Sequence, residues 1–194
     1  MSNFLTAGYV KLEKMLDPET IGIISQYFEN KINRREWQQK ELHPNDSSRY
    51  GYYADPLIEV FLKKFQCRVE QHTGLLLDPT YSFSRVYQGG ESLKPHTDRP
   101  SCEISVTVNV ACNDSQPWPI WMQYGSNDPV KCVLEPGDAV IYKGCDVTHW
   151  RTPLTEGCVN AQFMLHYVAK NGPNSQYKFD MRDAIGCPRE DREV

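Results

Sequence analysis

Apolar residues recur at helical spacing in two stretches near the start of the chain. The first stretch follows Asp17-Pro18 and the second follows Asp55-Pro56, and an aspartate before a proline is typical of a helix start. The second pattern ends at Gly74, a residue type that often terminates helices. The spaced apolar residues are Ile21, Ile24, Tyr27 and Phe28, then Leu57, Val60, Phe61, Phe65 and Val69. We predict two helices that each pack one face on a sheet.

The segment between these helices, residues 40–54, shows little periodicity. It is polar and contains the tyrosines Tyr50, Tyr52 and Tyr53. We predict a loop here, and such a loop is a candidate cover for a functional site.

From about residue 80 the pattern changes to short β-rich runs separated by Gly, Pro, Asn and Asp. Within one run, Ile104, Val106, Val108 and Val110 alternate with other residues and therefore share one face, as in a half-buried strand. The eight runs are 81–87, 92–96, 103–111, 119–124, 131–134, 139–142, 149–152 and 160–168. This succession predicts a closed or sandwiched β architecture with the helices on its outside.

The length of 194 residues and a hydrophobic content of 40% suit a single globular domain. We divide this domain, 1–194, into three parts. A helical N-terminal support with the candidate lid spans 1–79, the β core spans 80–168, and a polar C-terminal tail spans 169–194. We expect the end of this tail to be disordered.

Charge and composition exclude several classes of partner. A formal net charge of -4, without a basic run, provides no electrostatic footprint for nucleic acid or for an anionic membrane. We find neither a leader-like start nor an apolar segment long enough to cross a bilayer. The seven cysteines are scattered and never spaced as Cys-x-x-Cys, which favours reduced thiols. We therefore expect a cytoplasmic protein that binds neither nucleic acid nor membrane.

A candidate metal motif lies in the β-rich part. In His96-Thr97-Asp98 the two potential ligands are two residues apart, so an extended backbone directs both to one side. With His149 they form a candidate set of two histidines and one carboxylate, which binds Fe(II) on one face and leaves coordination positions open. The pattern therefore predicts a catalytic iron site.

The sequence around both parts of the motif adds specificity. The first part, Tyr87-Gln-Gly-Gly-Glu-Ser-Leu-Lys-Pro-His96-Thr-Asp98, reads as a strand, a Gly-Gly turn and a second strand. The second part begins at Leu134-Glu-Pro-Gly-Asp and continues through a strand and a turn to His149-Trp-Arg151. Together these motifs resemble the Fe(II)/2-oxoglutarate-dependent dioxygenase superfamily, in particular its compact prolyl-hydroxylase-like members. The resemblance covers about residues 80–168.

The resemblance implies a mostly β fold, the double-stranded β-helix of jelly-roll or cupin type, flanked here by the N-terminal helices. It also implies Fe(II) and 2-oxoglutarate as cofactors, O2 as co-substrate, and release of succinate and CO2. His96, Asp98 and His149 match the metal-ligand positions of the superfamily. Asp98 argues against its halogenating branch, where a small residue replaces the carboxylate. The expected reaction is hydroxylation of a small molecule, an amino acid or a peptidyl side chain, with prolyl hydroxylation as one form.

The chain departs from the superfamily at the site of the 2-oxoglutarate distal carboxylate. Many relatives carry Lys or Arg about ten residues after the distal histidine, where this chain has Val159 and Asn160. A buried dicarboxylate still needs cationic partners or several hydrogen bonds. Arg151 is two residues from His149, and Arg85 shares a face with Tyr87, a tyrosine position that contacts the oxoacid in several relatives. We rank Arg151 before Arg85 as the anchor.

The remaining candidates concern the substrate and rival functions. His43, His72 and His166 are more simply structural residues, because none has an acid at ligand spacing on one strand. His166, on the last predicted strand, is a candidate contact with oxoacid or substrate. The proposed substrate contacts are Arg99, Trp121, Trp150 and His166. Two alternatives stay open: a non-catalytic sensor domain that binds metal or oxoacid on the same fold, and a cupin-type metalloenzyme with His166 as an added ligand.

Overall fold

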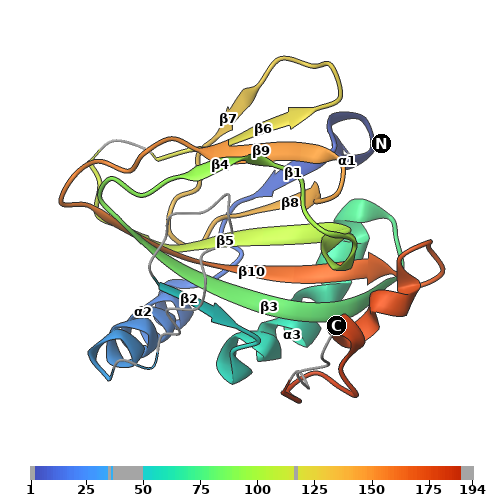
Figure 1. Cartoon of the computed structure of the whole chain (residues 1–194), viewed down its shortest axis with the longest axis horizontal. Helices are drawn as coiled ribbons and strands as arrows, with labels where there is room; N and C mark the ends of the chain where they lie inside the picture. The colour runs from blue at the N-terminus through green and yellow to red at the C-terminus, as the bar shows by residue number, and fades with distance from the viewer. Residues whose placement is uncertain (1–2, 35, 37–49, 116–117, 189–194) are drawn as a thin grey trace.

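The computed structural model describes residues 3–34, 36, 50–115 and 118–188. Two antiparallel sheets face each other, and helices cover the outer face of the larger one (Figure 1). The larger sheet has the strand order β1-β8-β5-β10-β3-β2, and the smaller sheet has the order β4-β9-β6-β7. The strands are β1 Tyr9–Leu12, β2 Tyr50–Tyr53, β3 Leu77–Gln88, β4 Leu93–His96, β5 Ile104–Cys112, β6 Ile120–Tyr124, β7 Val130–Cys132, β8 Ala139–Lys143, β9 Val147–Arg151 and β10 Val159–Ala169.

The eight strands β3 to β10 confirm the predicted β core. The chain passes repeatedly between the two sheets, with β3, β5, β8 and β10 in the larger sheet and the four others in the smaller one. This winding is the predicted double-stranded β-helix. Strands β1 and β2 extend the larger sheet at its two edges. Neither was predicted, because four residues are too few to establish a period.

Strand β2 corrects part of the predicted loop. Residues 50–53 pair with β3, with Tyr50 opposite Val86 and Tyr53 opposite Phe83. Backbone hydrogen bonds to β3 therefore hold this segment as a strand, although its sequence shows no strand alternation. The rest of the predicted cover, residues 40–49, lies outside the described residues.

The predicted helix starts are confirmed in detail. The Asp17 carboxylate accepts a hydrogen bond from the Thr20 backbone N–H at 2.8 Å, and the Asp55 carboxylate accepts from Leu57 and Ile58. Gly74 ends the second helix with a left-handed φ of 74°. The helices are α1 Asn3–Ala7, α2 Pro18–Asn33 and α3 Pro56–Thr73, with the 3-10 helices η1 Pro100–Cys102 and η2 Ser175–Met181.

The alternation in β5 separates a core face from a polar interior face. Ile104, Val106, Val108 and Val110 are buried in the apolar cluster that also contains residues of α2 and α3. The intervening Ser105 and Thr107 face away from this cluster: Ser105 contacts Asp98, and Thr107 lies 3.5 Å from the hydroxyl of Tyr142 on the neighbouring strand β8. The larger sheet therefore supplies hydrogen-bonding groups to the space between the sheets.

After β10 the chain packs back against α3 and β3. Arg182 forms a buried ion pair with Glu59 of α3 and donates to the Thr80 carbonyl oxygen. Asp180 is 2% exposed and binds Arg99. The C-terminal segment is thus part of the folded domain as far as residue 188, while the extreme end, 189–194, lies outside the described residues. Within the described part of the chain, no helix has the length and apolar character needed to cross a membrane.

Candidate metal centre

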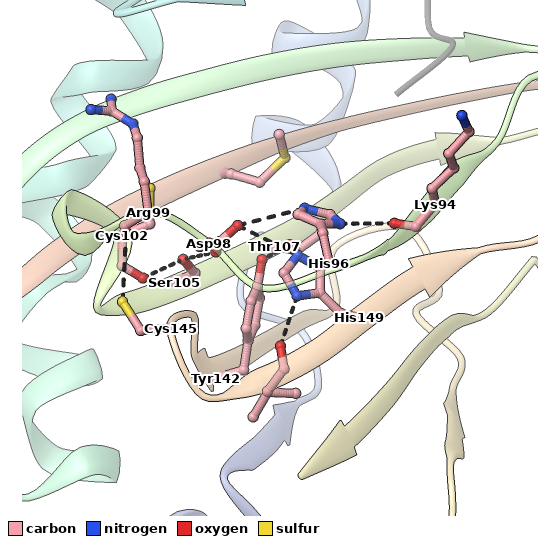
Figure 2. Close-up of polar contacts among 12 residues, drawn as sticks. Lys94, His96, Asp98, Arg99, Cys102, Ser105, Thr107, Tyr142, Cys145 and His149 are labelled. Atoms are coloured by element: carbon pink, nitrogen blue, oxygen red, sulfur yellow. Dashed lines mark hydrogen bonds and ion pairs between the residues drawn. The ribbon is translucent and has the colours of Figure 1, made fainter. Parts of the chain in front are cut away.

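Three side chains from β4, the following loop and β9 converge between the sheets (Figure 2). His96 and His149 are register partners across β4 and β9, with ring centroids 4.3 Å apart. Asp98 follows β4, and its Oδ1 lies 3.7 Å from His96 Nε2 and 3.6 Å from His149 Nε2. The structure therefore brings together the three residues that the sequence selected as metal ligands.

Backbone carbonyl groups orient both imidazoles toward Asp98. His96 Nδ1 lies 2.9 Å from the Lys94 oxygen, and His149 Nδ1 lies 3.0 Å from the Val147 oxygen. A carbonyl oxygen can only accept, so each Nδ1 carries the proton and each Nε2 presents a lone pair. Such hydrogen bonds on the remote nitrogen are usual for metal-binding histidines.

Burial keeps His149 in the neutral form that a metal requires. Desolvation lowers the pKa of His149 to about 4, and the positive charge of Arg151 acts in the same direction. The hydrogen bond to Val147 opposes this shift only in part. At neutral pH the imidazole is therefore uncharged and able to coordinate.

Two residues that the sequence analysis did not select hold Asp98 in place. The Asp98 backbone N–H donates to the Gly144 oxygen at 2.8 Å, and the Ser105 hydroxyl lies 2.8 Å from Asp98 Oδ2. A Cβ atom on Gly144 would lie only 2.6 Å from Asp98 Oδ2 and would also clash with the Cys102 carbonyl oxygen. A glycine at position 144 is thus needed for the close approach of the two loops.

Arg151 is a buried cation on the same strand face as His149. It is 3% exposed, donates to the Trp118 carbonyl oxygen at 2.7 Å and to Gln162 Oε1 at 2.8 Å, and packs on the Trp118 ring. Among the described residues it has no carboxylate partner, and its Nε has no hydrogen-bond partner. Burial lowers the pKa of Arg151 to about 10, so the group is still charged at neutral pH. A buried cation without a counter-ion favours an anionic ligand.

Tyr87 and Arg85 lie on β3, on the interior face of the larger sheet. Tyr87 is completely buried and packs in a T-shaped arrangement with the Trp118 ring, with a centroid distance of 5.1 Å. The Arg85 guanidinium lies 4.7 Å over the Phe83 ring, and burial lowers its pKa. Trp118 thus connects Tyr87 to Arg151, whereas Arg85 packs against a different aromatic residue.

The position that carries Lys or Arg in many relatives supplies no cation here. Val159 is 38% exposed, and Asn160 is buried with its amide donating to Asn109 Oδ1 at 2.9 Å. Gln162, two residues further along β10, binds Arg151 instead. The amide of Gln162 therefore fixes the Arg151 guanidinium from the last strand.

The predicted substrate contacts fall into different environments. Arg99 forms a two-point ion pair with Asp180, both N–O distances being 2.9 Å. His166 lies on the interior face, with Nδ1 2.9 Å from the Ser105 oxygen and its ring packed on Tyr81. His166 lies near Asp98, and the structure engages both side chains with protein partners.

Trp121 and Trp150 require a correction. They are opposite each other on β6 and β9 and stack with an interplanar angle of 4°. Trp150 follows His149 directly, and successive side chains of a strand point to opposite faces of its sheet. Met122 and His149 occupy the buried face, so the tryptophan pair lies on the outer face, away from the metal ligands.

Comparisons with known proteins identify the fold. No family model and no curated protein matches the sequence. A prolyl-4-hydroxylase from Pseudomonas putida superposes with a TM-score of 0.71 at 12% identity, covering 86% of this chain and 95% of that one. The epimerase SnoN from nogalamycin biosynthesis, described as non-heme and alpha ketoglutarate dependent, gives 0.74 at 10% identity, with coverages of 98% and 90%.

A third solved structure is a prolyl hydroxylase from Trichoplax adhaerens in complex with a peptide fragment of hypoxia inducible factor. Its TM-score is 0.69 at 16% identity, and the match covers 87% of this chain and 86% of that chain. The similarity extends over most of each chain, although few residues are identical. This chain therefore has the double-stranded β-helix fold of these oxygenases.

Proposed function

We propose that this protein is an Fe(II)- and 2-oxoglutarate-dependent oxygenase. The observation that carries the proposal is the arrangement of His96, Asp98 and His149, with both imidazoles fixed so that Nε2 faces the same carboxylate oxygen. Two nitrogen donors and one carboxylate on one side of a metal suit Fe(II) and leave positions open for other ligands. When bound, iron(II) activates O2 while 2-oxoglutarate supplies two electrons and leaves as succinate and CO2.

The residues around the three ligands support a dicarboxylate co-substrate. The unpaired Nε of Arg151 and the absence of an acidic partner for it among the described residues match the need of a distal carboxylate. Trp118 packs on the Arg151 guanidinium and Tyr87 packs on Trp118, so this side of the buried cation is shielded from water. We assign the distal carboxylate to Arg151, with Arg85 as the second candidate and Tyr87 as a further contact.

The proposed outcome is hydroxylation of a small molecule, an amino acid or a peptidyl side chain. Two of the similar structures are prolyl hydroxylases, and one of these carries a peptide. A third is an epimerase, so the fold serves more than one reaction. A substrate screen that measures succinate release and identifies the product by mass would distinguish these outcomes.

Anaerobic addition of Fe(II) and 2-oxoglutarate tests the cofactors directly. We expect a visible charge-transfer absorption that requires both components, because a chelated oxoacid and iron(II) share the site. Succinate should then form when O2 is admitted. Absence of the absorption at saturating concentrations of both would contradict the proposal. Formation of the complex without any succinate under O2 would instead favour a non-catalytic sensor.

Replacement of Arg151 by leucine should weaken 2-oxoglutarate binding. Hydrogen bonds to charged groups contribute about 1.5–3 kcal/mol, so we expect the dissociation constant to rise about 10- to 150-fold. A titration of the charge-transfer absorption with 2-oxoglutarate measures this constant, and Arg85→Leu provides the matched comparison. A larger loss in Arg85→Leu than in Arg151→Leu would assign the carboxylate to Arg85.

A further inference from the structure

Ser105 lies at a junction behind the candidate metal centre. Its hydroxyl oxygen is 2.8 Å from Asp98 Oδ2, 2.9 Å from His166 Nδ1 and 3.1 Å from the Cys102 carbonyl oxygen. Ser105 and His166 are register partners on β5 and β10, so two adjacent central strands of the larger sheet build this contact. Both residues are buried, at 0% and 5% exposure. Figure 2 shows Ser105 approaching Asp98 from the side opposite to the two histidine ligands.

The hydrogens at this junction can be assigned from the partners. The Ser105 hydroxyl has one hydrogen, and both the Asp98 carboxylate and the Cys102 carbonyl are acceptors only. The carboxylate is closer and charged, so it is the stronger acceptor. The Ser105 oxygen is then left to accept a hydrogen from His166 Nδ1. Burial lowers the pKa of His166 to about 3, so the ring is neutral at pH 7, and the contact with the Ser105 oxygen places its single proton on Nδ1.

This chain of hydrogen bonds gives the two carboxylate oxygens of Asp98 different partners. Oδ2 is bound by Ser105, whereas Oδ1 is the oxygen that lies 3.6–3.7 Å from both histidine Nε2 atoms. The Ser105 hydrogen bond competes with a metal for Oδ2 and so favours coordination through Oδ1 alone. If both oxygens chelated the metal, they would occupy one of the positions that a bidentate oxoacid and O2 need.

We propose that Ser105 and His166 are positioning residues that hold Asp98 as a one-oxygen metal ligand. This inference rests on the proposed function, because it requires a metal at His96, Asp98 and His149. Neither residue touches the metal in this arrangement. Their role is to keep a coordination position open for the co-substrate.

The main alternative is that His166 itself binds a metal. Donor atoms of Asp98, Cys102 and His166 do lie within 4.8 Å of one another. However, the Ser105 hydroxyl bridges Asp98 Oδ2 and His166 Nδ1, and burial raises the pKa of the Cys102 thiol so that it stays protonated. Metals bind the thiolate rather than the thiol. The contacts of this cluster therefore favour a hydrogen-bond network behind one metal over a second metal site.

Two replacements of His166 distinguish these roles. The side-chain amide nitrogen of asparagine can occupy the position of Nδ1, whereas that of glutamine corresponds to Nε2. A positioning role through Nδ1 predicts that His166→Asn keeps the network and His166→Gln breaks it. Ser105→Ala removes the donor to Asp98 directly. Ser84→Ala is the matched control, because Ser84 is also completely buried and its hydroxyl has no hydrogen-bond partner among the described residues.

The experiment is a titration of each metal-free protein with Co(II), followed by visible absorption. For Ser105→Ala and His166→Gln we expect affinity to fall about 10- to 100-fold, the range for the loss of a hydrogen bond that orients a ligand. The Co(II) band should also change shape and intensity, because Asp98 becomes free to chelate with both oxygens. His166→Asn and Ser84→Ala should retain the affinity and spectrum of the original protein. Thermal unfolding without metal verifies that each variant is folded.

Three results would overturn the inference, and each has its own signature. Unchanged affinity and spectrum in folded Ser105→Ala would show that Asp98 needs no such donor. Equal loss in His166→Asn and His166→Gln, with a spectrum that indicates one imidazole fewer, would make His166 a ligand. Failure of the original protein to bind Co(II) would refute the metal centre itself, and with it the proposed function.

Discussion

Replacing His149 with alanine is expected to abolish metal-dependent turnover. His149 supplies one of three donors, and its ring is fixed from both sides by the Val147 carbonyl and by contact with Tyr142. Alanine removes the donor and leaves His96 and Asp98, which cannot hold iron on one face. Loss of an orienting hydrogen bond alone costs about 10- to 100-fold, so loss of the ligand should reduce activity by more than about 100-fold. Succinate release under O2, together with iron content after dialysis, measures the effect.

His72→Ala is the control for this replacement. His72 lies near the end of α3, on the helix that packs against the outer face of the larger sheet. Its removal should change neither iron content nor succinate release. Iron retention and turnover in His149→Ala equal to those of the original protein would remove His149 from the site.

Local signals in the sequence predicted most of the fold. The aspartate caps before Pro18 and Pro56 determine where the helices begin, because their carboxylates bind backbone N–H groups within the first turn. Alternation in β5 predicted which residues would share the apolar face, but the strand is not half-buried as predicted, because its polar face is buried as well. The edge strand β2 was missed, since its order comes from pairing with β3 and not from a pattern of its own.

The three candidate ligands were predictable because their spacing is itself a chemical constraint. Ser105 and Gly144 were not, because their roles depend on tertiary contacts and not on a spacing that the sequence displays. Ser105 approaches Asp98 only when β5 lies behind the loop after β4, and Gly144 is required only where that loop meets the turn after β8. A serine in a strand and a glycine in a turn have many common explanations, so neither residue stands out alone.

The position of the tryptophan pair could have been predicted from the alternation of side chains along a strand. Trp150 is adjacent to His149, so if His149 faces the interior, Trp150 faces the opposite side. The same alternation places Arg151 inside, as the structure does. The ion pair of Arg99, in contrast, could not be predicted from the local sequence, because its partner Asp180 is 81 residues away in the folded C-terminal segment.

Replacing Glu59 with methionine should cause the largest loss of stability among these variants. Glu59 and Arg182 are 2% and 7% exposed, and the Glu59 carboxylate accepts from both Arg182 and the Gly186 backbone N–H. Methionine has a similar length but no charge, so the guanidinium would remain buried without its counter-ion. Breaking a buried ion pair in this way costs about 3–5 kcal/mol in free energy of unfolding.

Denaturant unfolding of Glu59→Met measures this cost, and Arg34→Ala is the matched control. Arg34 pairs with Glu36 at 2.7 Å, but the two side chains are 74% and 44% exposed, so its loss should change stability by less than about 0.5 kcal/mol. For a chain of this size, 3–5 kcal/mol corresponds to a melting temperature lower by about 6–20 °C. A shift in Glu59→Met no larger than in Arg34→Ala would mean that the pair is not buried in solution. A large shift would establish that the C-terminal segment, which also presents Asp180 to Arg99 beside the candidate ligand Asp98, is an integral part of the domain.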